Sequence, residues 1–473
     1  MAIFASNIIT SDSALGSAKI QRSLRFNRSD NAKLSKTFSS AGNRRKWTFS
    51  VWAKFPDPID SNTNQIFSYQ QGHVNHRGSF YKGSSGVLNY QLRVSGSRKA
   101  FVTTDAQLRD PNSWYHIVLV IDSDQGSSSD RVKIYINGVQ QSVVYHDTPT
   151  SGFDTWINST QTIYLGAAAD ENGGNMYLAE CNFIDGSALT PSSFGFTDPV
   201  TGIWMPKRYE GTYGTNGFYL DFADNSSTAA LGIDKSPNGN DWTTNNFSVA
   251  AWPENDSVID TPTNNFVTFN DNDRNSNAPL VNGGLQTAAT ATGGHYPAFT
   301  TMPVKSGKWY LEWKFLTNDS GLPSIMEANH DNTSYNTDST VGNNTSTVNK
   351  RGYGFLPGNG NTSSESGYAS YGSAMSSSDI GQCAFDADTG KIYWGKNGTF
   401  FNSGNPETGA NPAFSGIDMT KEYLFTWHVY GSNNNVSVNF GAQGFTYTPP
   451  AGFKALCQEN LPLTQSPSVI SRP

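Results

Sequence analysis

Two stretches of the chain alternate large apolar residues with polar residues over a full strand length. They are residues 46–54 (KWTFSVWAK) and 307–315 (GKWYLEWKF). A period of two predicts a β-strand with one face buried and the other face in water. Because the two stretches lie far apart and each opens a region rich in further strand patterns, we expect two separate β-sandwiches, one in each half of the chain.

Turn signals separate the other strand-like segments. They include Asn137-Gly138 in the first half, and Asp388–Gly390 and Asn397-Gly398 in the second half. Such pairs are typical of tight hairpins. No convincing amphipathic helix lies between the strand patterns, and parallel strands would need helical crossovers. The sheets are therefore predicted to be antiparallel.

The segment from Pro191 to about Gly294 has a different character, with loop-like stretches that are nonetheless rich in aromatic residues. It has too many aromatic residues for a flexible tether. We expect an ordered, irregular connector packed on one or both sandwiches. Within it, residues 217–222 (GFYLDF) are predicted to add a strand to a neighbouring sheet.

The length and composition support this division. The chain has 473 residues, of which 36% are hydrophobic and 13% aromatic. That length exceeds the size at which one hydrophobic core keeps growing. The predicted organisation is an N-terminal arm (1–19), a first sandwich (20–192), the connector (193–294), a second sandwich (295–456) and a C-terminal tail (457–473).

Other sequence features argue against several classes of protein. No apolar run is long enough for a membrane helix, and the N-terminus lacks the basic and apolar regions of a secretory signal. We therefore expect no membrane partner. The three cysteines, Cys181, Cys383 and Cys457, are widely spaced and form no CxxC pair. They are predicted to be buried reduced thiols in strands.

The formal net charge of −7 is unevenly distributed. Residues 1–133 contain 18 Lys and Arg against 9 Asp and Glu, a balance of +9, so the remainder has 14 against 30, or −16. The basic end could therefore face an acidic partner or the acidic body of a second copy. Arg44, Arg45 and Lys46 form the only three-residue basic run, which we interpret as solvated charge at a strand edge. Nucleic acid is not expected as a partner, because it would need a larger basic patch.

The order of motifs in the first half resembles the laminin G-like, concanavalin A-like jelly-roll domains over about residues 20–192. The motifs are LRFNRSDNAKLS, WTFSVWAKF, SWYHIVLVID, DRVKIYINGV and the segment from IYLGAAADENGG to FIDGSALT. In that family the SWYHIVLVID and DRVKIYINGV segments are neighbouring strands, and the second ends in an Asn-Gly turn.

The second half resembles the SPRY domain over about residues 295–456, through GKWYLEWKF, IGQCAFDADTGKIYWGKNG and VSVNFG. The polar stretch 318–350 is longer than the usual connection in that family. Together the two resemblances imply an all-β fold: two antiparallel β-sandwiches, a concanavalin A-like jelly roll and a SPRY domain, joined by an ordered irregular connector.

Candidate catalytic residues are few. Glucanases that resemble the first fold place carboxylates on alternate residues of one strand, facing one sugar. Here Glu180 is alone in its strand, and Asp185 has the opposite parity, so Glu180 is interpreted as structural. His73 and His76 lack a third metal ligand and are interpreted as exposed loop residues. Motifs for nucleophilic hydrolases, zincins and nucleotide binding are missing. The chain is therefore not expected to be an enzyme.

Two binding sites are possible. Asp122, Asp124 and Asp130 surround a loop between strands, and laminin G-like domains often hold Ca²⁺ at a loop rim. The alternative is a turn whose side chains bond its own backbone. Four tyrosines near the SPRY loops could stack on sugar rings of a glycan or contact another receptor, or they could simply be packed in the fold. They are Tyr335, Tyr353, Tyr368 and Tyr371.

The combined architecture resembles structural proteins of tailed bacteriophages, to which the stretches LRFNRSDNAKLSKTFSSAGNRRKWTFSVWAK and FIDGSALTPSSFG are also similar. This resemblance implies a virion surface protein, as a tail fibre or receptor-binding protein or as a capsid fibre or head decoration protein. The arm and first sandwich would dock to other virion proteins, and the SPRY loops would face host glycan or protein. A homotrimer is a natural fit for a fibre. A glycan-degrading depolymerase and a bacterial adhesin are the alternatives.

Overall fold

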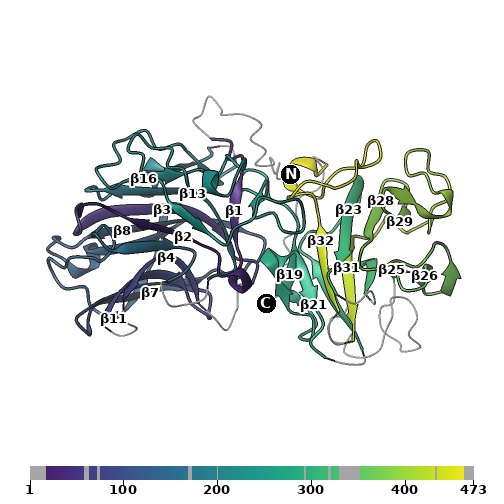
Figure 1. Cartoon of the computed structure of the whole chain (residues 1–473), viewed down its shortest axis with the longest axis horizontal. Coiled ribbons are helices and arrows are strands. Elements are labelled where there is room, and N and C mark those ends of the chain that lie inside the picture. The colour runs from purple at the N-terminus through teal and green to yellow at the C-terminus, as the bar shows by residue number, and fades with distance from the viewer. Residues whose placement is uncertain are drawn as a thin grey trace. The chain divides into compact units, whose positions relative to one another are not determined.

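The computed structural model describes residues 18–57, 63–71, 75–168, 173–199, 201–291, 294–317, 321–329, 352–431 and 434–462. The chain forms two compact units (Figure 1). The first unit contains the residues up to 250 together with 254–265, and the second contains 251–253 together with the residues from 266 onward. Across the described ranges there are β-strands and short 3₁₀ turns but no α-helix, and all paired strands are antiparallel. The predicted all-β, antiparallel fold class is confirmed.

The first unit is a sandwich of two large sheets, here called the β3 sheet and the β6 sheet. The β3 sheet has the order β10-β9-β8-β3-β13-β1-β18, with β16 also paired to β13. Its strands are β1 (Ser23–Phe26), β3 (Lys46–Lys54), β8 (Trp114–Asp122), β9 (Val132–Ile136), β10 (Val139–Gln140), β13 (Met176–Asp185), β16 (Phe218–Leu220) and β18 (Ser257–Val258).

The β6 sheet has the order β11-β7-β6-β5-β4-β12-β2-β17. Its strands are β2 (Lys33–Thr37), β4 (Asn64–Gln71), β5 (His76–Lys82), β6 (Val87–Val94), β7 (Ser97–Gln107), β11 (Val143–Asp147), β12 (Thr162–Leu165) and β17 (Thr243–Asn245). A separate hairpin joins β14 (Gly195–Thr197) to β15 (Trp204–Pro206).

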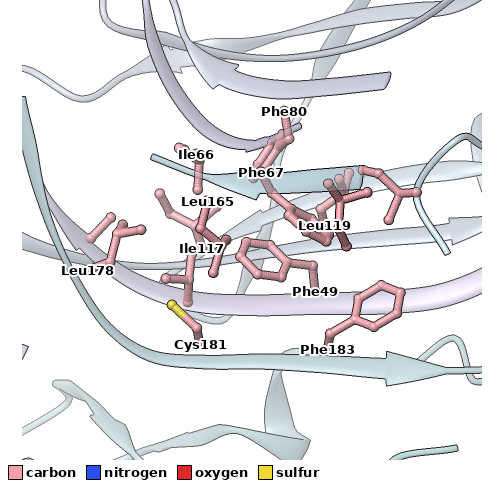
Figure 2. Packing of buried hydrophobic residues seen from close by; sticks show 14 of the residues in the cluster. Phe49, Ile66, Phe67, Phe80, Ile117, Leu119, Leu165, Leu178, Cys181 and Phe183 are labelled. Carbon is pink, nitrogen blue, oxygen red and sulfur yellow. The ribbon is translucent and has the colours of Figure 1, made fainter. Parts of the chain in front are cut away.

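An aromatic core fills the space between these two sheets. The rings of Phe49 and Phe67 stack with centroids 4.5 Å apart, and Phe183 meets Phe67 edge to face at 5.7 Å. Figure 2 shows these rings with the surrounding aliphatic side chains and Cys181. Because all of these side chains are fully buried, this cluster supplies most of the apolar area that holds the sheets together.

The connector does not form a body of its own. Its first part supplies β16, β17 and β18 to the sheets of the first unit, and β16 lies within the predicted strand 217–222. Its last part, from 266 to 294, supplies edge strands to the second unit. The structure thus divides the segment 193–294 between the two units. The reason is that its short strands cannot bury their apolar residues alone, whereas they can complete existing sheets.

The second unit is also a two-sheet sandwich. The β31 sheet has the order β19-β22-β31-β24-β25-β26-β27, and the β23 sheet has the order β20-β21-β32-β23-β28-β29-β30. The β31 sheet contains β19 (Phe269–Arg274), β22 (His295–Thr300), β24 (Leu322–Glu327), β25 (Gly352–Leu356), β26 (Asn361–Ser364), β27 (Gly367–Ser370) and β31 (Tyr423–Tyr430). The β23 sheet contains β20 (Leu280–Val281), β21 (Gln286–Ala288), β23 (Lys308–Phe315), β28 (Ile380–Asp386), β29 (Lys391–Lys396), β30 (Thr399–Phe400) and β32 (Asn435–Asn439).

The two Asn-Gly turns occur where the sequence predicts them. Asn137 and Gly138 have φ of 47° and 82° between β9 and β10, and Asn397 and Gly398 have φ of 51° and 84° between β29 and β30. Positive φ at both central residues closes a two-residue hairpin in the sense that matches strand twist, and Asn and Gly tolerate it.

The predicted alternation of buried and wet faces is wrong for both opening strands. In β3 every residue after Lys46 is buried, and in β23 the outward-facing Tyr310 and Glu312 are buried as well. The connector covers the outer face of β3, while backbone N–H groups of Thr446 and Tyr447 donate to the Glu312 carboxylate. The polar residues of the alternating pattern therefore face a second packed layer rather than solvent.

Candidate functional site

Tyr368 is the most exposed tyrosine among the described site candidates. It lies on β27, the last strand of the β31 sheet, and 48% of its surface is accessible. The strands β25, β26 and β27 form a meander in which Tyr368 stands opposite Ser363. Exposed Glu365 and Ser366 form the adjoining turn. This meander combines a half-exposed aromatic ring with small polar side chains, which is a suitable composition for a glycan or peptide contact.

The other tyrosine candidates serve packing or lie outside the described residues. The Tyr353 ring lies 5.0 Å from that of Phe414, and both pack against the core of the second unit. Tyr371 packs edge to face on Trp394, and burial raises the pKa of its hydroxyl. Tyr335 falls outside the residues that the structure describes. The packing interpretation therefore holds for Tyr353 and Tyr371.

The three aspartates proposed for Ca²⁺ do not converge. Asp122 pairs with Lys46 at 3.1 Å, Asp124 with Arg45 at 3.4 Å, and Asp130 with Lys133 at 3.0 Å. Each carboxylate thus faces its own cationic side chain instead of a shared centre. Among the described residues, no group of three or more His, Cys, Asp or Glu side chains is arranged to hold a metal.

Arg131 uses the loop carbonyl groups that a Ca²⁺ ion would need. Its guanidinium donates to the carbonyl oxygens of Gln125 at 2.8 Å, Gly126 at 2.7 Å and Pro149 at 2.7 Å. Calcium requires six to eight oxygen ligands around one point. Because the Arg131 guanidinium already donates hydrogen bonds to these oxygens, the loop does not fit a calcium site.

The basic residues 44–46 are also engaged in contacts with the aspartates of neighbouring loops. The run leads into β3, which is paired on both sides by β8 and β13, so it does not guard a sheet edge as predicted. Arg45 instead donates to Asp154 at 2.9 Å in addition to its contact with Asp124. The run thus ties the start of a central strand to loops that carry carboxylates.

Glu180 and Asp185 have separate structural roles. Glu180 has a positive φ of 53° at a bulge in β13, and its carboxylate accepts a hydrogen bond of 2.7 Å from the Tyr219 hydroxyl. Asp185 accepts hydrogen bonds from the backbone N–H groups of Asn43 and Asn216 and from the Asn158 amide. The two carboxylates do not form an acid and nucleophile pair.

Ser50 and His116 resemble a nucleophile and base, an arrangement that the sequence did not reveal. Ser50 Oγ and His116 Nε2 are 2.9 Å apart, and Trp204 Nε1 donates to His116 Nδ1 at 2.9 Å. Because Nδ1 accepts, the neutral ring carries its proton on Nε2 and cannot take one from Ser50. The histidine is 1% exposed, and burial lowers its pKa to about 3. The pair is therefore a structural contact.

The outward face of the β6 sheet carries a row of polar residues with an aromatic residue at each end. Strand register places Tyr164, Ser68, Ser79, Gln91 and Phe101 side by side across five strands. Ser68 and Ser79 are fully buried. Arg77 donates a hydrogen bond of 2.9 Å to the Ser79 hydroxyl, and its guanidinium lies over the ring of Tyr81. Side chains of the unit itself therefore already cover the centre of this face.

The core of the second unit holds a small cavity lined by apolar residues that include Phe269, Leu311, Trp394 and Phe440. It has room for no more than about one water molecule.

Of the two histidines predicted to be exposed in a loop, His76 is the one that the structure describes. It is half-buried on β5, with its ring 4.6 Å from that of Trp156. All three cysteines are buried without a disulfide, as predicted, but only Cys181 and Cys383 lie in strands, whereas Cys457 lies in an isolated β-bridge. The described chain has no helix long and apolar enough to cross a membrane.

Comparison with known proteins identifies one domain. Residues 26–191 match the family model Laminin_G_3, described as the concanavalin A-like lectin/glucanases superfamily. These residues form a laminin G-like, concanavalin A-like domain. No curated protein sequence matches the chain.

Solved structures with some likeness include a SPRY domain, a pentraxin and a laminin fragment. The SPRY domain of human HERC1 is 17% identical, with 36% of this chain and 96% of that chain covered and a TM-score of 0.28. The heptameric SAP-like pentraxin from Limulus polyphemus is 19% identical, with 49% and 94% covered and a TM-score of 0.30. Domains LG4-5 of the mouse laminin alpha1 chain are 10% identical, with 96% and 91% covered and a TM-score of 0.30.

Proposed function

We propose that this chain is a non-enzymatic structural protein of a tailed-bacteriophage particle, a tail fibre or receptor-binding protein that presents the β25–β27 meander to host glycan or protein. The observation that carries the proposal is the exposed ring of Tyr368 on the outermost strand of an otherwise well-packed sandwich. A large aromatic side chain that stays half exposed in the fold is a candidate contact for a partner.

The proposed contact is passive stacking. One face of the Tyr368 ring packs on the apolar face of a sugar or a partner side chain, and the polar groups of Ser364, Ser366 and Ser370 exchange hydrogen bonds with hydroxyl groups. A single contact of this size binds weakly. Many copies at fixed spacing on a particle raise the effective concentration, so attachment becomes strong through multiplicity.

The engagement of carboxylates in structural contacts supports a function without catalysis. Three carboxylates accept hydrogen bonds from hydroxyl or backbone N–H groups of the fold, namely those of Glu180, Asp185 and Glu312. The carboxylates of Asp122 and Asp124 are paired with the side chains of Lys46 and Arg45. A glycan-degrading depolymerase would need a carboxylate pair free to act on substrate.

The virion assignment rests on the sequence stretches that resemble phage proteins, namely residues 24–54 and 183–195. On this proposal the arm and the first sandwich, whose residues 1–133 carry a balance of +9, attach to other virion proteins. A trimer would present three meanders together. The second candidate, a capsid fibre or head decoration protein, shares the same folds and differs in position on the particle.

The test is adsorption of particles or purified protein to host cells with the Tyr368→Ala variant. We expect host binding to fall at least about tenfold, because one aromatic contact of about 1.4 kcal/mol corresponds to a factor of ten. Tyr145→Ala is the matched control, since Tyr145 is an exposed tyrosine (37%) on an edge strand of the first unit. Equal binding by wild type and the Tyr368→Ala variant would contradict the proposed contact.

Two further measurements separate the alternatives. Antibody labelling of intact particles would place the chain on the tail or on the head, and its absence from particles would refute the virion assignment. Incubation with purified host capsule would release reducing ends if the chain were a depolymerase. We expect no release.

A further inference from the structure

Lys54, the last residue of β3, lies in an unusual environment for a lysine. Its side chain is 0% exposed, and Nζ lies 2.8 Å from Asp260 Oδ2 and 2.8 Å from Asn265 Oδ1. The ring of Tyr177 lies beneath Nζ at 5.9 Å. An amine, a carboxyl group and a carboxamide are thus gathered at one buried point on the outer face of the β3 sheet.

The carboxyl group and the carboxamide are each held in place by other contacts. Trp114 Nε1 donates to Asp260 Oδ1 at 3.0 Å, and Ser23 Oγ donates to the Asp260 carbonyl at 2.6 Å. Asn265 Nδ2 donates to the Asn112 carbonyl at 2.6 Å. Because Nζ touches Oδ1 of Asn265, the amide carbon bonded to that oxygen is adjacent to the amine. Fixed proximity of this kind converts a slow bimolecular reaction into a unimolecular one.

The surroundings also favour the nucleophilic form of the amine. Burial is the main influence on Lys54 and lowers its pKa, against the opposing effect of the Asp260 charge. A desolvated lysine amine that can lose its proton to a neighbour is an activated nucleophile. The carboxylate oxygen at 2.8 Å is the neighbour that can accept this proton.

We propose that Lys54 and Asn265 join in an intramolecular isopeptide bond, with Asp260 as the catalytic residue that carries the protons. The Lys54 ammonium gives one proton to Asp260, and the free amine attacks Cγ of Asn265 to form the new C–N bond. Asp260 gives its proton to the amide nitrogen of Asn265 and takes one from the attacking nitrogen. The C–N bond to the old amide nitrogen then breaks, and the departing ammonia takes the proton from Asp260 and leaves as ammonium.

The atoms and charge balance without an added reagent. The ammonium of Lys54 and the carboxamide of Asn265 yield the secondary amide and one ammonium ion, and Asp260 returns to its carboxylate form. No oxidation or reduction occurs. The only requirement is the folded first unit, since the three residues are far apart in the sequence.

The bond would act as a mechanical clamp. Asn265 is the last residue of the first unit, and the chain continues from there into the second unit. The covalent link would close a loop between two residues 211 positions apart and join Asn265 to a central strand. A pulling force that enters at residue 265 would then pass into β3 without unfolding the segment between. This inference does not depend on the proposed virion role.

The direct test is the intact mass of the purified full-length chain. We expect a mass lower than the sequence mass by one ammonia molecule. Tryptic digestion should release residues 47–77 joined to residues 236–274, because the modified Lys54 is no longer a cleavage site. Under denaturing, reducing electrophoresis the chain should migrate faster than an unlinked variant.

Variants identify the bond. Lys54→Arg and Asn265→Ala should both have the full sequence mass, and Asp260→Asn should lose ammonia slowly or not at all. Asp256→Asn disrupts a different buried ion pair in the same segment, and Asn264→Ala changes the adjacent residue, so both controls should lose ammonia like wild type. Folded wild-type protein that retains its full mass on prolonged incubation would overturn the proposal. Ammonia loss that persists in Lys54→Arg or Asn265→Ala would also overturn it.

Discussion

The buried His116 makes a sharp prediction about acid stability. Its ring lies between Trp52 and Trp204, and its two nitrogens contact the indole N–H of Trp204 and the hydroxyl of Ser50. Protonation of Nδ1 would place two donors against each other. In addition, burial disfavours the charged ring and lowers the pKa of His116 to about 3, from the ordinary histidine value of 6.5.

Proton linkage sets the direction in which the stability of the fold changes with pH. Between the two pKa values the unfolded chain binds a proton at His116 and the folded chain does not, so acidification favours unfolding. Stability from this group is fully present above about pH 6.5 and is lost progressively toward pH 3. Below pH 6.5 the slope approaches about 1.4 kcal/mol per pH unit, which gives a loss of about 3 kcal/mol between pH 7 and pH 4.5.

The assay is urea unfolding of wild type and His116→Gln, followed by tryptophan fluorescence at several pH values. Other carboxylates and histidines titrate equally in both proteins, so the difference between them isolates His116. At pH 7 the variant should be less stable than wild type, because the hydrogen bond from Trp204 is perturbed. The unfolding transition that moves in the variant is that of the first unit, which contains His116. By pH 4.5 the wild type should have lost about 3 kcal/mol more than the variant. Parallel pH profiles for the two proteins would refute this account.

Two further pairs of substitutions test the packing. Asp256→Asn leaves a buried arginine, 2% exposed, without its charged partner, and we expect a loss of about 3–5 kcal/mol in thermal unfolding. Asp147→Asn breaks an ion pair of which both partners are more than a third exposed, so its effect should stay below about 1 kcal/mol. Gly381→Ala places a methyl group against the buried indole ring of Trp313 and should cost about 1–3 kcal/mol, with Gly358→Ala, which meets no atom, as the neutral control. Equal melting temperatures within either pair of variants would contradict the corresponding contact.

Local features of the sequence were enough to locate strands and turns. The stretch 46–54 is a strand with those same bounds, and both Asn-Gly pairs form the predicted hairpin turns. The resemblance over residues 20–192 agrees closely with the family match over 26–191. Period-two patterning and turn chemistry act between near neighbours in the chain, so they can be read without knowledge of the fold.

Candidate sites were less predictable, because their character depends on residues distant in sequence. Asp124 is paired with Arg45, 79 positions away, so it does not converge with the other aspartates of its loop. Tyr353 and Tyr368 occur in similar polar, glycine-rich stretches, yet one packs against a core and the other is exposed. No local pattern distinguishes them.

The sequence by itself determined that the chain builds antiparallel sheets and where most of their turns lie. Only the tertiary structure decided what covers those sheets. The alternation in β3 predicts a wet outer face, but the connector folds over it and buries His116 and Lys54. The physical reason is that periodicity records which side of a strand faces the first core, whereas docking of a segment some 200 residues away depends on shape, buried ion pairs and hydrogen bonds that exist only once both are folded.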